Sequence, residues 1–289
     1  MVTSLRIGQS NAAKHLLYIF FLMSLKIQLS KETESKIIYL YTAQNMSMRK
    51  ISQEIKLSQR VIQRVLKEHN IEIRTNQVYR RKQVDENYFN KIDTEEKAYI
   101  LGFIYADGCV TNHHLRFKVA LKDIEILEKI KAALKSEHDI GVYVNNNGYA
   151  KGNKYCSLSM KNYQIEKDLA MLGVYPRKTK TLLFPIYNQV PIELIRHFIR
   201  GFFDGDGSVY KSSSPVVSFT GTYDMLLGVQ RELSKLTQSK AQIYPYKNKD
   251  VFDYKIGGKN NLIKIYDYFY KDATIFLGRK KYKFEESLR

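Results

Sequence analysis

Two aspartates that could act together, Asp107 and Asp206, each end a copy of one apolar pattern. The copies span residues 100–108 and 199–207, and each has small residues four positions apart: Gly102 and Ala106 in the first, Gly201 and Gly205 in the second. Because residues at i and i+4 share one face of a helix, two such helices can pack backbone against backbone, and the carboxylates then meet at one end of the seam. Two carboxylates offer the oxygen ligands that hard divalent cations such as Mg²⁺ prefer.

Either Asp-Gly pair taken alone is typical of the turn that ends a helix. The stretch Asp204-x-Asp206-Gly207 is also a poor calcium-binding loop, because its sixth position is not glycine and its spacing differs. The repetition of the pattern, each time after an apolar helix, favours a shared site over two unrelated turns.

The segments that follow the two copies repeat one order of elements. Strict alternation over residues 115–122 predicts a strand with one apolar and one basic face. The other expected elements are helices at 123–134, 162–172, 223–236 and 261–270, and strands at 142–144, 155–160, 216–222, 243–246 and 252–256. This order predicts an α+β protein of two halves, 93–185 and 186–289, related by a pseudo-twofold axis.

Residues 26–75 predict a small all-α domain of the helix-turn-helix type. Ile51 and Ile55 face inward from a short helix, and Ser58 is placed to cap the next one. Five polar side chains of that second helix are candidates for contacts with bases or phosphates: Gln59, Arg60, Gln63, Arg64 and Lys67. The basic linker 76–92 follows, in which Arg80 and Arg81 are candidates for tracking phosphates. The alternative is the solvated basic face of an ordinary helical bundle.

Composition limits the class of protein and its partners. Lys and Arg total 47 against 29 Asp and Glu, and the resulting charge of +18 indicates a polyanionic partner such as nucleic acid or an acidic membrane surface. Two cysteines are too few for a disulfide framework or a Cys-based zinc site and indicate a reducing compartment. The apolar run 16–25 is shorter than the about 20 residues that span a bilayer, so no membrane span is expected, and residues 1–25 stand as an extension outside the fold. The expected compartment is the cytoplasm of a bacterium, where the protein could also be encoded by a phage, or an organelle matrix.

At its two motifs the chain resembles the LAGLIDADG homing endonucleases, in their single-chain form with two motifs and an added amino-terminal helix-turn-helix. The resemblance covers residues 93–289. It implies two αββαββα halves that lay one β-sheet each along the major groove of DNA. It also implies intron homing through a cut of both strands across the minor groove, which leaves 3′ overhangs.

The resemblance assigns the metal site to the ends of the motifs. Asp107 and Asp206 are then ligands of Mg²⁺ or Mn²⁺, with the backbone carbonyls of Ala106 and Gly205 as co-ligands. The chain departs from the family pattern at Tyr105, which stands where the second copy has an acid.

The family also uses a basic residue from each half to position water or to stabilise charge. Lys178 and Lys280 lie in the matching segments and are the candidates for this catalytic role. The alternative for both is a contact with a phosphate.

The resemblance implies that the protein is a monomer and that its partner is double-stranded DNA. Side chains on the exposed strand faces are the candidates for reading or holding the DNA: Arg116, Lys118 and Lys122 in the first half, and Ser218, Thr220 and Thr222 in the second. A basic face opposite a hydroxyl-rich one predicts a long, non-palindromic target. Two alternatives are an RNA maturase that binds intron RNA and a DNA-binding regulator that does not cut. The retention of Asp107 and Asp206 favours cleavage.

Overall fold

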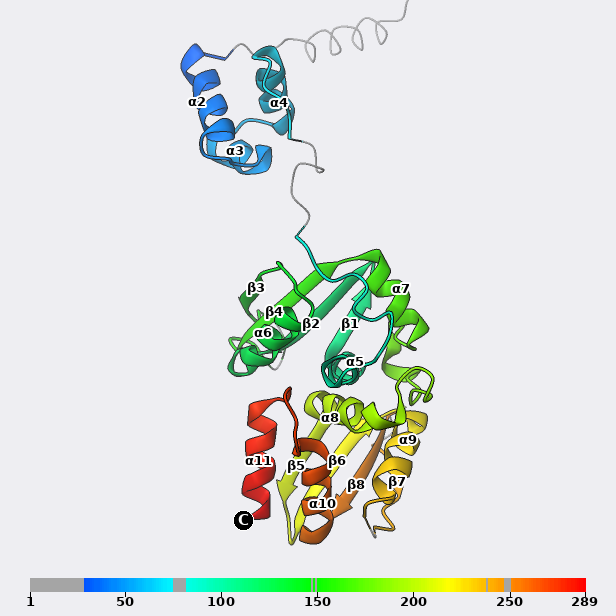
Figure 1. Ribbon diagram of the computed structural model, residues 1–289. Helices are drawn as coiled ribbons and strands as arrows, with labels where there is room; N and C mark the ends of the chain where they lie inside the picture. Colours follow the sequence, from blue (N-terminus) through cyan, green and yellow to red (C-terminus); the bar gives the residue numbers. More distant parts are fainter. Residues whose placement is uncertain (1–28, 75–81, 147, 149, 238, 247–250) are drawn as a thin grey trace, which may run out of the picture. The chain divides into compact units, whose positions relative to one another are not determined.

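The computed structural model describes residues 29–74, 82–146, 148, 150–237, 239–246 and 251–289. The chain divides between residues 81 and 82 into two compact units. Figure 1 shows that the first unit is helical and that the second contains two β-sheets, each with its own helices. Among the helices that the structure describes, none is long and apolar enough to cross a membrane.

Three helices form residues 29–74, the described part of the first unit: α2 (Lys31–Thr42), α3 (Met48–Ile55) and α4 (Gln59–Glu68). A serine caps each helix, and the expected cap at Ser58 accepts a hydrogen bond from the amide of Val61. The turn between α3 and α4 is tight because Lys56 adopts a left-handed conformation, with φ of 58°. A separate core joins the three helices: Ile37, Leu40, Tyr41, Ile51, Ile62, Val65 and Leu66.

The first half of the second unit begins with α5 (Glu95–Asp107), whose start is fixed by a hydrogen bond from the Lys97 amide to the Thr94 side chain. The elements that follow are β1 (Gly108–Thr111), β2 (His114–Ala120), η1 (Leu121–Asp123), α6 (Ile124–Ala133), β3 (Ile140–Val144), β4 (Lys154–Lys161) and α7 (Tyr163–Met171). A connection that contains η2 (Lys178–Lys180) and η3 (Ile192–Leu194) leads to the second half.

The second half repeats this order and adds one helix. Its elements are α8 (Ile195–Asp206), β5 (Gly207–Lys211), β6 (Pro215–Gly221), α9 (Tyr223–Ser234), β7 (Ile243–Pro245), β8 (Phe252–Gly257), α10 (Lys259–Tyr270) and α11 (Gly278–Leu288). The strand orders are β1-β2-β4-β3 and β5-β6-β8-β7, and all pairs in both sheets are antiparallel. The predicted α+β class with two equivalent halves is therefore confirmed.

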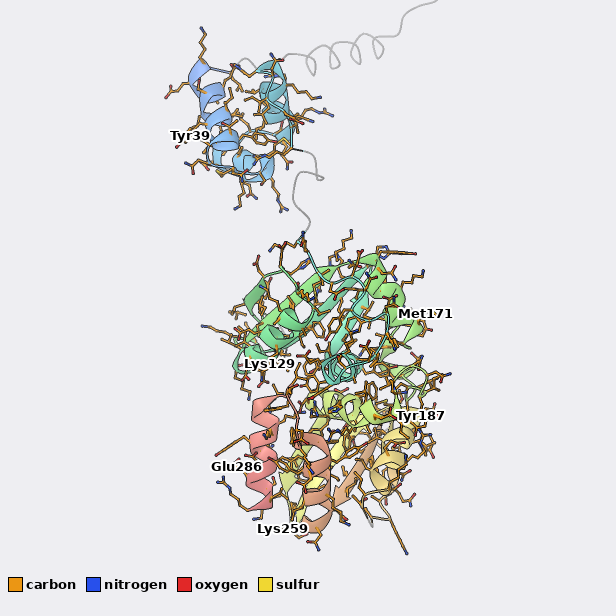
Figure 2. The ribbon with its side chains drawn as sticks, viewed as in Figure 1. Tyr39, Lys129, Met171, Tyr187, Lys259 and Glu286 are labelled. Atoms are coloured by element: carbon orange, nitrogen blue, oxygen red, sulfur yellow. The ribbon has the colours of Figure 1, made fainter. Side chains whose placement is uncertain are left out.

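Equivalent positions of the two sheets follow from their registers. Gly108, the residue after the first motif aspartate, pairs with Phe117, and Gly207 pairs with Phe219 in the same way. Both phenylalanines are fully buried, and side chains fill the space between each sheet and its helices (Figure 2). The apolar face of β2 is Leu115, Phe117 and Val119, as the alternation predicts.

The two halves meet where α5 packs against α8. A β-carbon added to Gly102 would lie 2.0 Å from the carbonyl oxygen of Phe198, and one added to Gly201 would lie 2.0 Å from that of Tyr99. Each glycine therefore lets the backbone of the partner helix approach. The predicted seam of small residues is confirmed.

Candidate active site and nucleic-acid interface

The two motif aspartates lie at one end of the α5–α8 seam. Asp107 is the last residue of α5 and Asp206 the last of α8, and both side chains are exposed. The helix ends approach each other closely, because a β-carbon added to Gly205 would lie 2.2 Å from that of Ala106 and 3.4 Å from Oδ2 of Asp107. The fold thus brings together the two carboxylates of the repeated motif.

The surroundings of these carboxyls oppose their ionisation. The packed helix ends partly remove Asp206 from solvent, and the negative charge of Asp107 adds to this effect, so that the pKa of Asp206 rises to about 6. Partial desolvation also raises the pKa of Asp107, against the influence of Lys280 and Lys178. A nearby positive charge therefore favours the ionised form of both acids.

Lys178, in η2, reaches the end of α5. Its Nζ donates hydrogen bonds to the carbonyl oxygens of Tyr105, at 2.7 Å, and Ala106, at 3.1 Å. The side chain is buried, and burial lowers the pKa of Lys178 although Asp206 and Asp107 raise it.

Lys280, in the first turn of α11, reaches the end of α8, and its contact with Gly205 corresponds to that of Lys178 with Ala106. Its Nζ donates to the carbonyl oxygens of Phe203, at 2.8 Å, and Gly205, at 3.2 Å, and also to that of Gly207. Burial lowers the pKa of Lys280 to about 8. The two candidate lysines thus join the two aspartates in one cluster, which is called the acid–lysine cluster below: Asp107, Asp206, Lys178 and Lys280.

The donor atoms of this cluster fit a small hard cation. Asp107 and Asp206 present exposed carboxylate oxygens, and Mg²⁺ is commonly held by one or two carboxylates while it keeps several waters. The carbonyls of Ala106 and Gly205 accept from the lysines, but a carbonyl oxygen has two lone pairs, so each can still accept a second partner. Among the described residues, no group of three or more His, Cys, Asp or Glu side chains could hold a metal ion. Metal binding by Asp107 and Asp206 stays a prediction.

Tyr105 and Asp204, which share one motif position, tie down the segments that carry the lysines. The Tyr105 hydroxyl donates to the carbonyl of Leu172 at 2.5 Å, and Oδ2 of Asp204 accepts from the backbone amide of Leu277 at 2.7 Å. Leu277 is the N-cap residue of α11, so the second bond sets the start of the helix that carries Lys280. The family pattern drew attention to both positions, but not to this shared task.

A buried polar group that sequence reasoning missed supports the same segment. Arg200 is fully buried and donates to the carbonyls of Ile275, at 3.1 Å, and Phe269, at 2.7 Å. It also donates to Oε1 of Glu95 at 2.7 Å, and Glu95 in turn accepts from the amide of Thr274 at 2.8 Å. The only available signal was a charged residue inside an apolar motif.

The outer face of the first sheet carries the predicted basic side chains. Arg116 and Lys118 are exposed on β2 and line a groove of about 540 Å³. Nζ of Lys118 lies 3.9 Å from the centre of the Tyr155 ring and donates to Asn145 at 3.2 Å. Lys122 is exposed but lies in η1 beyond the end of β2, because the strand is shorter than its alternation predicted.

The outer face of the second sheet differs. Thr220 is partly exposed on β6 and donates to Oδ1 of Asp253 on β8 at 2.8 Å, while Ser218 is largely buried on the same face. Nζ of Lys255 lies 3.1 Å from Oδ2 of Asp253. The pair of Asp253 and Lys255 was missed, although both belong to a predicted strand.

The expectation that Thr222 reads DNA is corrected by its place in the fold. Thr222 follows the end of β6 and is buried, with its hydroxyl bonded to the carbonyl of Leu182. Its side chain also accepts from the amide of Met225 at 3.2 Å and so caps α9. A threonine before a helix is a frequent cap, and this role keeps it from the sheet surface.

The exposed face of α4 carries four of its predicted contact residues: Gln59, Arg60, Gln63 and Lys67. Arg64 is half-buried and its Nε lies 3.8 Å from Oε1 of Glu68. Arg80 and Arg81 lie outside the described residues. Base or phosphate contacts by all of these side chains stay predictions.

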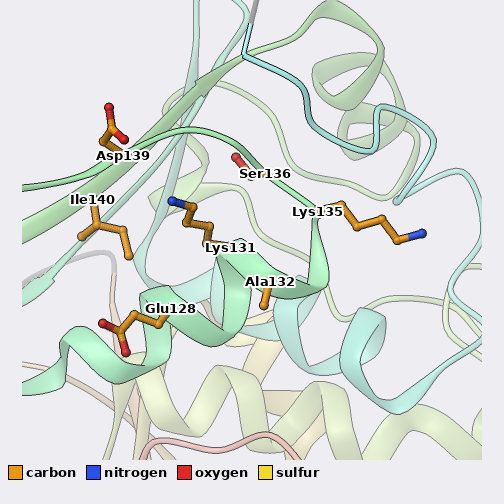
Figure 3. A pocket seen from close by; sticks show the side chains of 7 residues that line it. All are labelled: Glu128, Lys131, Ala132, Lys135, Ser136, Asp139 and Ile140. Carbon is orange, nitrogen blue, oxygen red and sulfur yellow. The ribbon is translucent and has the colours of Figure 1, made fainter.

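A separate hollow of about 450 Å³ lies between the end of α6 and the start of β3 (Figure 3). Its lining is Glu128, Lys131, Ala132, Lys135, Ser136, Asp139 and Ile140. The lining includes none of the residues of the acid–lysine cluster, and it shares only Asp139 with the groove beside Arg116.

Two curated proteins of Methanocaldococcus jannaschii are similar to part of this chain. DNA-directed RNA polymerase subunit Rpo1C is 24% identical over 194 residues, which cover 65% of this chain and 20% of that protein. The probable translation initiation factor IF-2 is 28% identical over 173 residues, which cover 57% of this chain and 14% of that protein. The matched region is thus a fifth or less of either relative.

One solved structure of similar fold is the homing endonuclease I-WcaI bound to its DNA recognition sequence. It has a TM-score of 0.51 and 15% sequence identity, over 69% of this chain and 91% of that chain. In sequence, residues 193–269 match the profile of a LAGLIDADG-like domain. The second half of this chain therefore contains a LAGLIDADG-like domain.

Proposed function

We propose that the protein is a site-specific endonuclease that cuts both strands of duplex DNA with Mg²⁺ or Mn²⁺. The observation that carries the proposal is the acid–lysine cluster, in which equivalent residues of two halves converge at the end of one helix seam. Each sheet begins at the residue after its motif aspartate, so a duplex that lies on both sheets passes the cluster.

The residues of the cluster have complementary tasks in hydrolysis. Asp107 and Asp206 would hold the cation, which when bound supplies charge neutralisation at the phosphate and activation of water. The charges of Lys178 and Lys280 favour the ionised carboxylates that such binding needs. The same ammonium groups can offset the negative charge that develops on the phosphate in the transition state.

Duplex DNA is the substrate that fits the rest of the molecule. The net charge of +18 favours a polyanion, and I-WcaI, whose fold is similar, binds a DNA recognition sequence. One chain supplies both carboxylates, which supports action as a monomer. The first unit would add a second contact through α4, as a helix-turn-helix does.

The two binding-only alternatives have less support. Neither RNA maturation nor transcriptional regulation needs a pair of converging carboxylates, and this chain keeps both. We therefore favour cleavage with 3′ overhangs at a long, non-palindromic site, as the family resemblance implies.

The test uses the full chain and a pool of random DNA duplexes. Duplexes bound in EDTA are recovered and sequenced, the enriched site is cloned into a plasmid, and that plasmid is incubated with protein and Mg²⁺. We expect a linear product with 3′ overhangs in Mg²⁺ and binding without cleavage in EDTA. Cutting that persists in EDTA, or enrichment of no duplex sequence, would contradict the proposal.

A further inference from the structure

The outer face of the second sheet carries an acid and a base locked together. Asp253 and Lys255 lie two residues apart on β8 and therefore share one face of the sheet, while Tyr254 between them is buried. Nζ of Lys255 lies 3.1 Å from Oδ2 of Asp253. Thr220, opposite Asp253 on β6, donates to its Oδ1 at 2.8 Å, so both carboxylate oxygens have a partner.

The first sheet has no such pair at the same positions. The matching registers of Phe117 and Phe219 make Ser157 equivalent to Asp253 and Ser159 equivalent to Lys255. The two halves of a DNA site would therefore meet different side chains at these positions: two serines under the first sheet and the acid–base pair under the second.

A phosphate is a poor partner for this pair. The carboxylate of Asp253 lies beside the ammonium of Lys255 and cancels much of the attraction of that ammonium for an anion. The carboxylate would also repel a phosphate. Base edges differ from phosphates because they present donors beside acceptors. The pair therefore suits a base edge in the major groove.

The hydrogen-bonding capacity of the pair selects one base pair. A lysine ammonium has three donors, and the one directed at Asp253 leaves two for other acceptors. Guanine is the base that offers two neighbouring acceptors, O6 and N7, in the major groove. The N4 amino group of the paired cytosine lies next to O6 and donates, and an ionised carboxylate has acceptor sites left after two hydrogen bonds.

The two side chains differ in their exposure to solvent. The Lys255 side chain is 48% exposed and can reach into a groove, whereas that of Asp253 is 9% exposed and is held from two sides. The hydrogen bond from Lys255 raises its own pKa, so the side chain stays charged. Thr220 acts through Asp253 and is a positioning residue.

We propose that Lys255 and Asp253 together read one G·C base pair in the half-site bound by the second sheet. Lys255 donates to O6 and N7 of guanine, and Asp253 accepts from N4 of its cytosine. This inference rests on the proposed function, because it assumes that the outer faces of the sheets lie in the major groove. It makes the two half-sites chemically different.

The test compares the base preferences of the full-length wild type, Asp253→Asn and Lys255→Gln after selection from the pool of random duplexes. We expect both variants to lose at least about tenfold of the preference for G·C at the same single position, because each substitution removes one of the two partners that contact this base pair. Matched controls on the exposed surface of α10, Lys264→Gln and Asp267→Asn, should keep every preference. Lys255→Gln changes an exposed side chain and serves as the second variant if Asp253→Asn folds poorly.

Three results would overturn the inference. In the first, Lys255→Gln keeps the base preferences of the wild type. In the second, the variants lose affinity uniformly for all sequences. In the third, the wild type prefers A·T at the position that the variants affect. In each of these the wild type still selects DNA, so the proposed function survives. A wild type that enriches no duplex refutes the proposed function, and the inference falls with it.

Discussion

Tyr105 and Asp204 occupy the same position of the two motif helices and fix equivalent segments through hydrogen bonds of opposite polarity. The tyrosine hydroxyl donates to a backbone carbonyl, that of Leu172, whereas the aspartate accepts from a backbone amide, that of Leu277. Each bond restrains the chain shortly before a lysine of the acid–lysine cluster. The departure of the first motif from the family pattern thus changes the chemistry of the tie and keeps its purpose.

Asp204→Ala is expected to slow cleavage at saturating DNA by about 10- to 100-fold, because a small displacement of a reacting group can cost this much. The substitution removes the tie to Leu277, and Lys280 in the next turn loses its fixed position. DNA affinity should stay near that of the wild type. Single-turnover cleavage rates and dissociation constants separate the two effects.

Asp204→Asn provides the control for this positioning role. Oδ2 accepts both from Leu277 and from the Tyr99 hydroxyl at 2.7 Å, and Oδ1 has no partner among the described residues. An amide oxygen at the place of Oδ2 can accept the same two bonds, so Asn should restore most of the rate. A variant Asp204→Asn as slow as Asp204→Ala would show that the charge, and not the tie, matters.

Gly201→Ala is expected to destabilise the fold by about 3 kcal/mol or more, because the added β-carbon would lie 2.0 Å from the carbonyl oxygen of Tyr99. The helices α5 and α8 would have to separate along their whole contact. Urea unfolding measures the loss. Gly257→Ala is the matched control, since its nearest atom would be 3.7 Å away, and its effect should stay below about 1 kcal/mol. Equal stabilities of the two variants would contradict the close packing of the seam.

His197 is expected to contribute a loss of stability as the pH falls from about 6.5 to about 4, whereas Asp204 and Asp206, whose pKa values are raised to about 6 in the folded state, contribute in the opposite direction. Burial and the positive charge of Arg200 lower the pKa of His197 to about 4 in the folded state, whereas an unfolded histidine has its ordinary pKa of about 6.5. Between these values the unfolded histidine binds the extra proton, so the contribution of His197 to stability rises with pH across this window, by up to about 3 kcal/mol.

Urea unfolding at pH 7 and pH 5 tests this dependence. His197→Gln should remove this contribution and so lose less stability, or gain more, than the wild type between pH 7 and pH 5. His114→Gln, which lies on β2 away from Arg200, should change as the wild type does. The same change in stability between the two pH values in His197→Gln and in the wild type would argue against a neutral, buried His197.

The halves, their seam and the cluster could be predicted because local signals carry them. Glycines four apart on an apolar helix have few uses other than close helix contact, and alternation over 115–122 separates the two faces of β2. The lysines followed from the family resemblance, and the structure shows that both reach the ends of the motif helices.

The contacts that depend on distant residues could not be predicted. Arg200 and Glu95 are 105 residues apart, and no periodicity links a buried arginine to its partner. Thr222 is the last residue of a predicted strand, and only its hydrogen bonds show that it caps α9 instead of facing the solvent. The pair of Asp253 and Lys255 needs the strand register to become visible.

The most direct test of the account is the cleavage of a bound, enriched duplex in Mg²⁺ by the wild type, Asp107→Asn and Asp206→Asn, with Asp267→Asn on exposed α10 as the matched control. Each substitution removes one proposed ligand of the cation but none of the described DNA-binding candidates. We expect both motif variants to bind the duplex with near wild-type affinity and to produce no measurable double-strand cleavage, while Asp267→Asn cuts like the wild type. Undiminished double-strand cleavage by Asp107→Asn or Asp206→Asn would contradict the assignment of the active site.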